Sequence, residues 1–300
     1  QIPKWIMVDT KRMIETYGKC IITKKIAGNR YDTKQIQLFG LEKEDLDRLW
    51  NTYAIAELNR GFLPQEYEEY TTGRLWGKTF YSFQLMPRRM LPYIIPKTWD
   101  YDFEACHPTL LVYLSKKVDS KIKTPTLNKY LRERKIIRQK ISKEIGSNVD
   151  RVKRAINALG YDAPMKCGVY PDKETEENKD YALQDILGDA SCEKFIKNKL
   201  VLSINTEMDE CKKIILNHSP YIQNCPPGMK RSSKISFILN HKERELLEIM
   251  IREIQKQNVP IIALMHDGII IKNKIEEEKI TNAILKETGI QIKLDRKQIQ

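Results

Sequence analysis

The hydrophobic pattern in the last third of the chain predicts a buried hairpin. Two apolar runs rich in β-branched residues, 261–265 and 269–271, flank the dipeptide His266-Asp267 and a glycine. This order is typical of a strand, a tight turn and a second strand. A carboxylate at such a bend is costly to bury unless metal cations lie close to it. A plain Asp-Gly turn is the other interpretation of the same residues.

A second strand-like run follows Pro96 and carries Asp102, and an apolar helical pattern comes directly after it. Asp100 points to the same side of such a strand as Asp102, because side chains two positions apart share a face. If the two predicted strands are neighbours in one sheet, Asp102 and Asp267 can converge on a pair of Mg²⁺ ions. The pattern therefore predicts a two-metal site for phosphoryl transfer, with Asp100 and Asp102 competing for the first position.

Helical periodicity predicts several amphipathic helices elsewhere in the chain. They cover residues 42–59, two segments of 126–161, then 192–217 and 240–256. Gly146 marks the break within the second pair, and Ser147 or Asn148 is expected to cap the helix that follows. Residues 171–178 are polar and acidic, which predicts an exposed loop.

The net charge of +12, from 52 Lys and Arg against 40 Asp and Glu, fits a protein that binds phosphate backbones. Twelve basic and three acidic residues between Lys121 and Arg154 give that stretch a net charge of +9. A solvated helical face is the ordinary explanation of such a run. Here six cations are opposed only by Glu133 and Glu144, which favours phosphate contact. The six are Arg132, Arg134, Lys135, Arg138, Lys140 and Lys143.

The remaining composition limits the class of protein. Three hundred residues, 41% of them hydrophobic, can bury a substantial core. No apolar run reaches the ~18 to 20 residues of a membrane span, so we expect a soluble, intracellular protein of the cytoplasm or a host-cell nucleic-acid compartment. Six cysteines without a C-x-x-C pair indicate neither a zinc site nor a disulfide framework. The first residue is Gln1 and not Met, from which we expect either a segment of a longer protein or a processed product.

Four sequence elements follow one another in order between residues 71 and 275. Thr72-Gly73-Arg74-Leu75 comes first, Asp102 precedes a helix, Lys153 and Tyr161 form a Lys-x7-Tyr pattern, and His266-Asp267 lies at the hairpin tip. This order and spacing resemble the family A nucleic-acid polymerases, which include bacterial DNA polymerase I and the single-subunit phage RNA polymerases. The resemblance favours Asp102 over Asp100 as the first metal ligand.

The resemblance implies an α+β right-hand polymerase fold, with an antiparallel palm sheet, helical fingers and a reduced, thumb-like N-terminal part. The expected boundaries are a thumb-like region at 1–70, palm at 71–120 and 200–300, and fingers at 121–199. The implied activity is that of a DNA polymerase, with a DNA (or RNA) primer-template and nucleoside triphosphates as partners. Since residues 1–70 are few for a family thumb, a longer parent polypeptide or an accessory replication protein would assist it.

The site residues that the resemblance implies fall into three groups. Asp102 and Asp267, with the backbone carbonyl of Phe103, would hold two Mg²⁺ ions, for which Mn²⁺ can substitute. Lys153 would be a catalytic cation that stabilises the charge on separating pyrophosphate. The nucleotide-binding residues would be Arg151, Arg154, Asn157, Tyr161 and His107. Contacts to the nucleic acid would come from Arg74, His266 and Asn240.

Three positions depart from the family pattern. Gly268 stands where DNA polymerases of the family often have an acid, so metal binding would rest on two aspartates. Asp162 replaces the usual glycine after the fingers tyrosine. Val149 replaces a basic residue, for which Arg151 or Arg154 could substitute.

Other functions compete with the DNA polymerase interpretation. His107 occupies the position that governs sugar choice in the family; its bulk favours deoxynucleotides, but its imidazole could also bind a 2′-hydroxyl, as in an RNA polymerase or primase. A metal hydrolase could use His266-Asp267, although the remaining histidines lack suitable spacing. A non-catalytic basic nucleic-acid-binding protein would explain the charge but not two strand-end aspartates.

Overall fold

Two compact units make up the chain. The computed structural model describes residues 4–23, 30–31, 33–69, 74–171 and 178–300. Unit 1 consists of residues 1–104 and 246–300, and unit 2 consists of residues 105–245. Helix α12 (Arg231–Lys256) begins in unit 2 and ends in unit 1.

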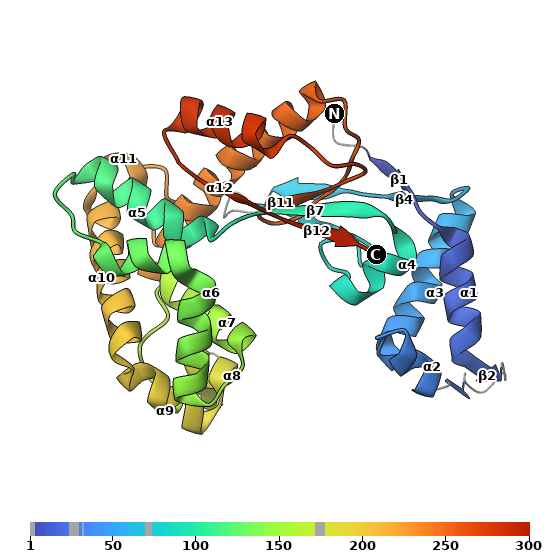
Figure 1. Ribbon diagram of the computed structural model, residues 1–300, viewed down its shortest axis with the longest axis horizontal. Coiled ribbons are helices and arrows are strands. Elements are labelled where there is room, and N and C mark those ends of the chain that lie inside the picture. Colours follow the sequence, from blue (N-terminus) through green and yellow to red (C-terminus); the bar gives the residue numbers. More distant parts are fainter. Residues whose placement is uncertain (1–3, 24–29, 32, 70–73, 172–177) are drawn as a thin grey trace. The chain divides into compact units, whose positions relative to one another are not determined.

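Unit 1 contains a four-stranded antiparallel sheet in the order β10-β11-β7-β12, and Figure 1 shows β7 between β11 and β12. The predicted strands are present: β7 (Thr98–Phe103) carries Asp102, and β10 (Ile261–Leu264) and β11 (Gly268–Ile271) form the hairpin. Its other elements are β1 (Trp5–Met7), α1 (Thr10–Cys20), β2 (Ile21–Thr23), β3 (Arg30–Tyr31), α2 (Thr33–Leu38), α3 (Lys43–Leu58), β4 (Phe62–Pro64), β5 (Tyr67–Glu69), β6 (Leu75–Gly77), η1 (Arg88–Met90), α4 (Leu91–Ile94), α13 (Glu277–Thr288) and β12 (Leu294–Ile299).

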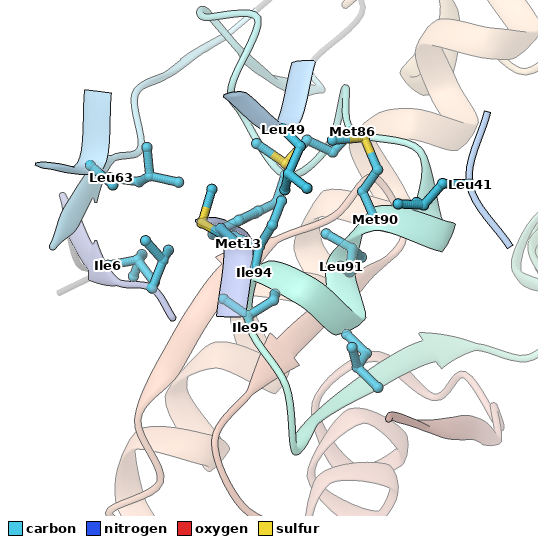
Figure 2. Packing of buried hydrophobic residues seen from close by; sticks show 14 of the residues in the cluster. Ile6, Met13, Leu41, Leu49, Leu63, Met86, Met90, Leu91, Ile94 and Ile95 are labelled. Atoms are coloured by element: carbon cyan, nitrogen blue, oxygen red, sulfur yellow. The ribbon is translucent and has the colours of Figure 1, made fainter. Parts of the chain in front are cut away.

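The core of unit 1 joins its N-terminal helices to the sheet. Met13 of α1, Leu49 of α3 and Ile94 of α4 are among the buried side chains drawn in Figure 2. Ala263 and Ile270, from β10 and β11, belong to the same cluster. Because each fully buried aliphatic side chain contributes about 1.5 to 3 kcal/mol, this core fixes the sheet strands that carry the aspartates.

Unit 2 is mainly helical. Its elements are α5 (Cys106–Val118), α6 (Pro125–Ile145), α7 (Val149–Gly160), β8 (Val169–Pro171), β9 (Asn178–Asp180), α8 (Ala182–Leu187), α9 (Asp189–Lys197), α10 (Lys199–Asn217), α11 (Ser219–Ile222) and the first part of α12. The predicted break between α6 and α7 is confirmed, and the cap is Asn148, whose side chain accepts from the Arg151 N–H. Residues 172–177 of the predicted loop lie outside the described residues.

Two sequence-based predictions for unit 2 were wrong. The single helix predicted at 192–217 is divided into α9 and α10 by Asn198, whose side chain accepts from the N–H groups of Leu200 and Val201 and so starts a new helix. Cys167 and Cys192 form a disulfide, with their Cα atoms 6.0 Å apart. Their separation of 25 residues left no local signal, because the pairing depends on the fold around α9.

The expected palm, fingers and thumb boundaries stay a prediction, since packing units need not coincide with functional subdivisions. Packing places α5 and residues 200–245 in unit 2, whereas the expected boundaries assign them to the palm. None of the helices within the described part of the chain is long and apolar enough to span a membrane.

Candidate active site

Backbone pairing places Asp102 and Asp267 at the same end of two adjacent strands. In the antiparallel pair of β7 and β11, Asp102 lies opposite Gly268, the residue that follows Asp267. The N–H of Phe103 donates to the carbonyl of Asp267 at 3.1 Å. The ladder therefore brings the backbones of Asp102 and Asp267 to neighbouring positions, from places far apart in the sequence.

The close approach of β7 explains why residue 268 is glycine. A Cβ atom on Gly268 would stand 2.2 Å from the carbonyl oxygen of Tyr101 and 2.3 Å from Oδ1 of Asp102. Neither distance is possible without moving the strand. The carboxylate of Asp102 thus fills the space that a side chain at 268 would need, and no second acid can follow Asp267 in this arrangement.

Arg88 is a member of the site that the sequence patterns do not indicate. Its Nη1 lies 3.0 Å from Oδ2 of Asp100, and its Nη2 lies 3.3 Å from Oδ2 of Asp102. Asp100 is only 6% exposed. The two aspartates share one face of β7, as strand parity predicts, and one guanidinium spans both.

The charges of this cluster act on one another. Burial, and then repulsion by Asp102 and Asp267, raise the pKa of Asp100 to about 6, against the attraction of Arg88. Partial burial opposes the charge of Arg88, but Asp100, Asp102 and Asp267 together raise the pKa of its guanidinium. All three carboxylates therefore lie within electrostatic reach of one arginine.

The oxygen atoms of the cluster fit a hard divalent cation. Oδ1 of Asp100 and Oδ1 of Asp102 are buried, and neither has a hydrogen-bond partner among the residues that the structure describes. Within those residues, no group of three or more His, Cys, Asp or Glu side chains is arranged to hold a metal ion by itself. Mg²⁺ rarely needs three protein ligands, because it is commonly held by one or two carboxylates together with substrate phosphates and water.

The predicted nucleic-acid contacts of unit 1 lie near the hairpin. The ring of His266 packs against Trp76 of β6, with centroids 4.4 Å apart. Arg74 immediately precedes β6, whereas Thr72 and Gly73 of the same motif lie outside the described residues. The hydroxyl of Tyr67 accepts from the N–H of Leu264 and so connects β5 to β10. Arg74 and His266 are thus parts of one neighbourhood.

In unit 2, His107 connects the predicted Tyr161 to an acid that we did not predict. The Tyr161 hydroxyl lies 2.5 Å from Nδ1 and 3.2 Å from Nε2 of His107. The Nε2 atom of His107 also lies 2.7 Å from Oε2 of Glu243. Glu243 is 1% exposed. Glu243 falls on the apolar stripe of the predicted helix, one turn before Leu246 and Leu247. An acid on a buried stripe indicates a buried partner, and this signal could have identified it.

The cations predicted to bind nucleotide lie on the exposed face of α7. Arg151, Lys153, Arg154 and Asn157 are all exposed, while Val152, Ala155, Ile156 and Leu159 are buried. At about 100° per residue, Asn157 lies about 40° from Lys153 around the helix, and Tyr161, the C-cap, lies about 80° from it. Arg151 falls about 160° from Lys153, at the far border of the exposed face.

Asp162 has a structural reason to replace the usual glycine. Its φ of 71° lies in the left-handed region that favours glycine and that aspartate also tolerates. Its Oδ1 accepts from Nζ of the buried Lys212 at 2.9 Å, and Lys212 also donates to the carbonyl of Leu159 at 3.0 Å. The substituted residue thus anchors the end of α7 next to Tyr161.

Two predicted polar contacts are buried. Asn240 is 5% exposed, and its Oδ1 has no hydrogen-bond partner within the described ranges. Arg138 was predicted to contact phosphate, and this was wrong: it is 9% exposed and donates through Nε to the Tyr130 hydroxyl at 2.8 Å. Arg132, Lys135, Lys140 and Lys143 remain exposed on α6.

Comparison with solved structures supports a polymerase-like fold. The chain is similar to the POL domain of Pol1 from M. smegmatis, solved in complex with DNA primer-template and dNTP, with a TM-score of 0.56 and 10% sequence identity. The alignment covers 97% of this chain and 66% of that chain. No protein-family profile matches the sequence, and no curated protein matches it. At this identity the likeness shows the fold alone.

Proposed function

We propose that this protein is a template-directed nucleotidyltransferase, a distant relative of the family A DNA polymerases that adds nucleotides to a primer 3′ end. The observation that carries the proposal is the pairing of β7 with β11, which places Asp102 and Asp267 at adjacent strand ends. The similarity to a polymerase domain that binds DNA primer-template and dNTP supports nucleic acid and nucleoside triphosphates as partners.

Asp102 and Asp267, with the carbonyl of Phe103, would hold two Mg²⁺ ions in unit 1. Bound Mg²⁺ would activate the primer hydroxyl and stabilise charge on the transferring phosphoryl group. The protein's own contribution would be to hold the two strand ends that carry Asp102 and Asp267 in fixed positions before substrate binds. This fixed placement reduces the reorganisation that the reaction would otherwise require.

The helix α7 would bind the triphosphate in unit 2. Lys153 and Arg154 are exposed cations, and pyrophosphate departure leaves negative charge that such cations stabilise. Arg151, Asn157 and Tyr161 would complete the nucleotide-binding surface. In this assignment, the buried side of α7 packs against the rest of unit 2, and its exposed side binds the triphosphate.

The contacts of His107 favour deoxynucleotides. A neutral imidazole has one donor and one acceptor nitrogen, and here Glu243 and Tyr161 occupy both. In the tautomer whose proton is on Nε2, His107 would donate to Glu243 and accept from the Tyr161 hydroxyl through Nδ1. A 2′-hydroxyl would then meet the bulk of the imidazole ring, both of whose nitrogens already have partners. This arrangement disfavours the RNA polymerase or primase alternative.

Primer extension tests the proposal. A labelled primer on DNA and RNA templates would be supplied with Mg²⁺ and with dNTPs or NTPs in separate reactions. We expect extension with dNTPs, and almost none with Asp102→Asn or Asp267→Asn. Asp185→Asn, the same change at an exposed acid of α8, is the control and should behave as wild type.

Each other outcome selects a different function. Extension with NTPs alone would support an RNA polymerase or primase. Binding of nucleic acid without extension would support a non-catalytic binding protein. If Asp267→Asn extends primers at nearly the wild-type rate, the metal assignment is wrong.

A further inference from the structure

The guanidinium of Arg88 lies across the carboxylates that the proposed function uses. We propose that Arg88 is a tethered counter-cation, which holds Asp100 and Asp102 while no metal is bound and which a divalent cation displaces from Asp102. The inference rests on the proposed function only in treating Asp102 as a metal ligand.

One oxygen atom is the point of competition. Oδ1 of Asp102 is buried, in the space where a Cβ of Gly268 would otherwise stand. Oδ2 is therefore the oxygen that a cation from solvent reaches first, and Arg88 Nη2 lies 3.3 Å from it. A guanidinium and a divalent cation repel each other strongly at such short range, so they cannot share this oxygen without cost.

The neighbouring arginine shows how a fixed guanidinium is bound in the same segment. Arg89 binds Asp45 through Nε and Nη2, at 2.5 and 3.2 Å, and Asp45 is a buried member of the capping box of α3. Arg88 instead gives one nitrogen to each of two carboxylates, and its side chain is 52% exposed. The Arg89 side chain is 40% exposed, so bonding and not burial separates the two arginines. Two parallel hydrogen bonds to one carboxylate are stronger than single contacts to two carboxylates, so Arg88 is the arginine that a metal ion displaces more easily.

The buried carboxylate explains why a cation is needed before any metal arrives. Asp100 is nearly inaccessible, and an unpaired buried charge is strongly destabilising. Arg88 neutralises it in the metal-free protein, and a divalent cation brings two positive charges to the same cluster. The affinity of the free protein for metal then depends on the difference in free energy between the Arg88-paired cluster and the metal-bound cluster. It rises when triphosphate oxygens add further ligands to the metal.

Direct measurement of metal binding tests the role of Arg88 independently of catalysis. The full chain would be titrated with Mn²⁺, whose free aqua ion gives an electron paramagnetic resonance signal that disappears on binding, without nucleotide or nucleic acid. Arg88→Met should bind Mn²⁺ about 10-fold more tightly than wild type, which corresponds to ~1.4 kcal/mol. Arg88→Lys, which keeps the charge but cannot span both carboxylates, should fall between them. Arg252→Met removes an exposed arginine of unit 1 that pairs with Glu253 and Glu287, and should bind as wild type.

Two results would overturn the proposal. One is equal or weaker Mn²⁺ binding by an Arg88→Met protein that is folded by circular dichroism; if that variant does not fold, Arg88→Lys decides in the same way. The other is a gain in affinity that persists when Asp102→Asn is added, because the metal then binds elsewhere. An Asp102-dependent gain without primer extension by the wild type would uphold the role of Arg88 and reject the proposed function. Primer extension by the wild type without a gain in Mn²⁺ affinity in Arg88→Met would uphold the proposed function and reject the role of Arg88.

Discussion

The two units hold their candidate site residues in opposite ways. In unit 1 the carboxylates lie at the ends of hydrogen-bonded strands, and Arg88 already neutralises part of their charge. In unit 2 the cations Lys153 and Arg154 lie on an exposed helix face whose opposite side is buried. The position of each carboxylate is therefore set by long-range strand pairing, and that of each cation by local helical spacing.

This difference follows from what each group must do. Carboxylates that are to share metal ions repel one another until the metal binds, so a rigid ladder has to hold them together. Cations that meet a triphosphate need no such support, because water solvates them until the ligand arrives. Changes to unit 1 should therefore affect stability and activity together, while changes on the exposed face of α7 should affect activity alone.

The largest expected effect is that of Gly268→Ala in unit 1. The new methyl group would overlap Tyr101 O and Asp102 Oδ1, and overpacking against backbone costs about 3 kcal/mol or more. Urea unfolding should show this loss of stability, and primer extension should be lost with it.

Gly18→Ala provides the control for that change. Gly18 lies within α1 with no neighbouring atom within 4 Å of an added Cβ, so alanine should stabilise the helix by about 0.5 to 1 kcal/mol. If Gly268→Ala keeps wild-type stability, the strands are not as close as the structure has them, and the comparison between the units fails.

The next effect concerns Asp100 and pH. Its folded-state pKa of about 6 lies above the ordinary value of 3.8, so the folded state binds the proton more tightly. Stability should then fall as pH rises from about 4 to 6, by up to about 3 kcal/mol at ~1.4 kcal/mol per pKa unit. Asp100→Asn should remove this fall, which unfolding measured in metal-free buffer between pH 4 and 7 would show. The same slope in both proteins would mean that Asp100 does not titrate as its burial implies.

The elements that depend on local patterns could be predicted from the sequence. The apolar runs around His266 and Asp267 predicted the hairpin, and Gly146 with Asn148 predicted the break between α6 and α7. The spacing of Lys153, Asn157 and Tyr161 predicted one helix that carries the first two residues and ends at the third. Hydrophobic period and capping chemistry encode all of these within a few residues.

What could not be predicted depends on side chains that meet through the fold. No sequence pattern near Arg88 indicates that its guanidinium contacts both Asp100 and Asp102, which lie twelve and fourteen residues later. The adjacent Arg89 binds Asp45 instead. Arg138 lies in a charged run but is buried against Tyr130, because helical phase, and not charge, decides which side of α6 it faces. From the sequence, Gly268 was interpreted as the replacement of an acidic residue. In the structure, the carboxylate of Asp102 occupies the space that a side chain at position 268 would need.

A smaller effect should come from Lys153→Ala on the exposed face of α7. If Lys153 stabilises the departing pyrophosphate, its loss should reduce kcat/KM for the triphosphate by roughly 10², about 2.7 kcal/mol of transition-state stabilisation. Thermal stability should stay unchanged, because the side chain is exposed. Lys166→Ala, at another exposed lysine of unit 2, should lower neither quantity. A large loss of stability in Lys153→Ala would contradict the division of roles between the units.

The smallest effects should come from single cations of α6. Lys135 and Lys143 are exposed, so if they contact phosphates, Lys135→Gln or Lys143→Gln should each reduce the slope of log affinity against log salt by about 0.9 on duplex DNA. Arg138→Gln carries the same charge change on the same helix but at a buried position, so it should lower stability and leave the slope as in wild type. Fluorescence anisotropy with a labelled duplex, between about 50 and 200 mM salt, measures all three slopes. If the lysine variants keep the wild-type slope, this face of α6 is only solvated, and the positive charge of unit 2 would act on nucleic acid elsewhere.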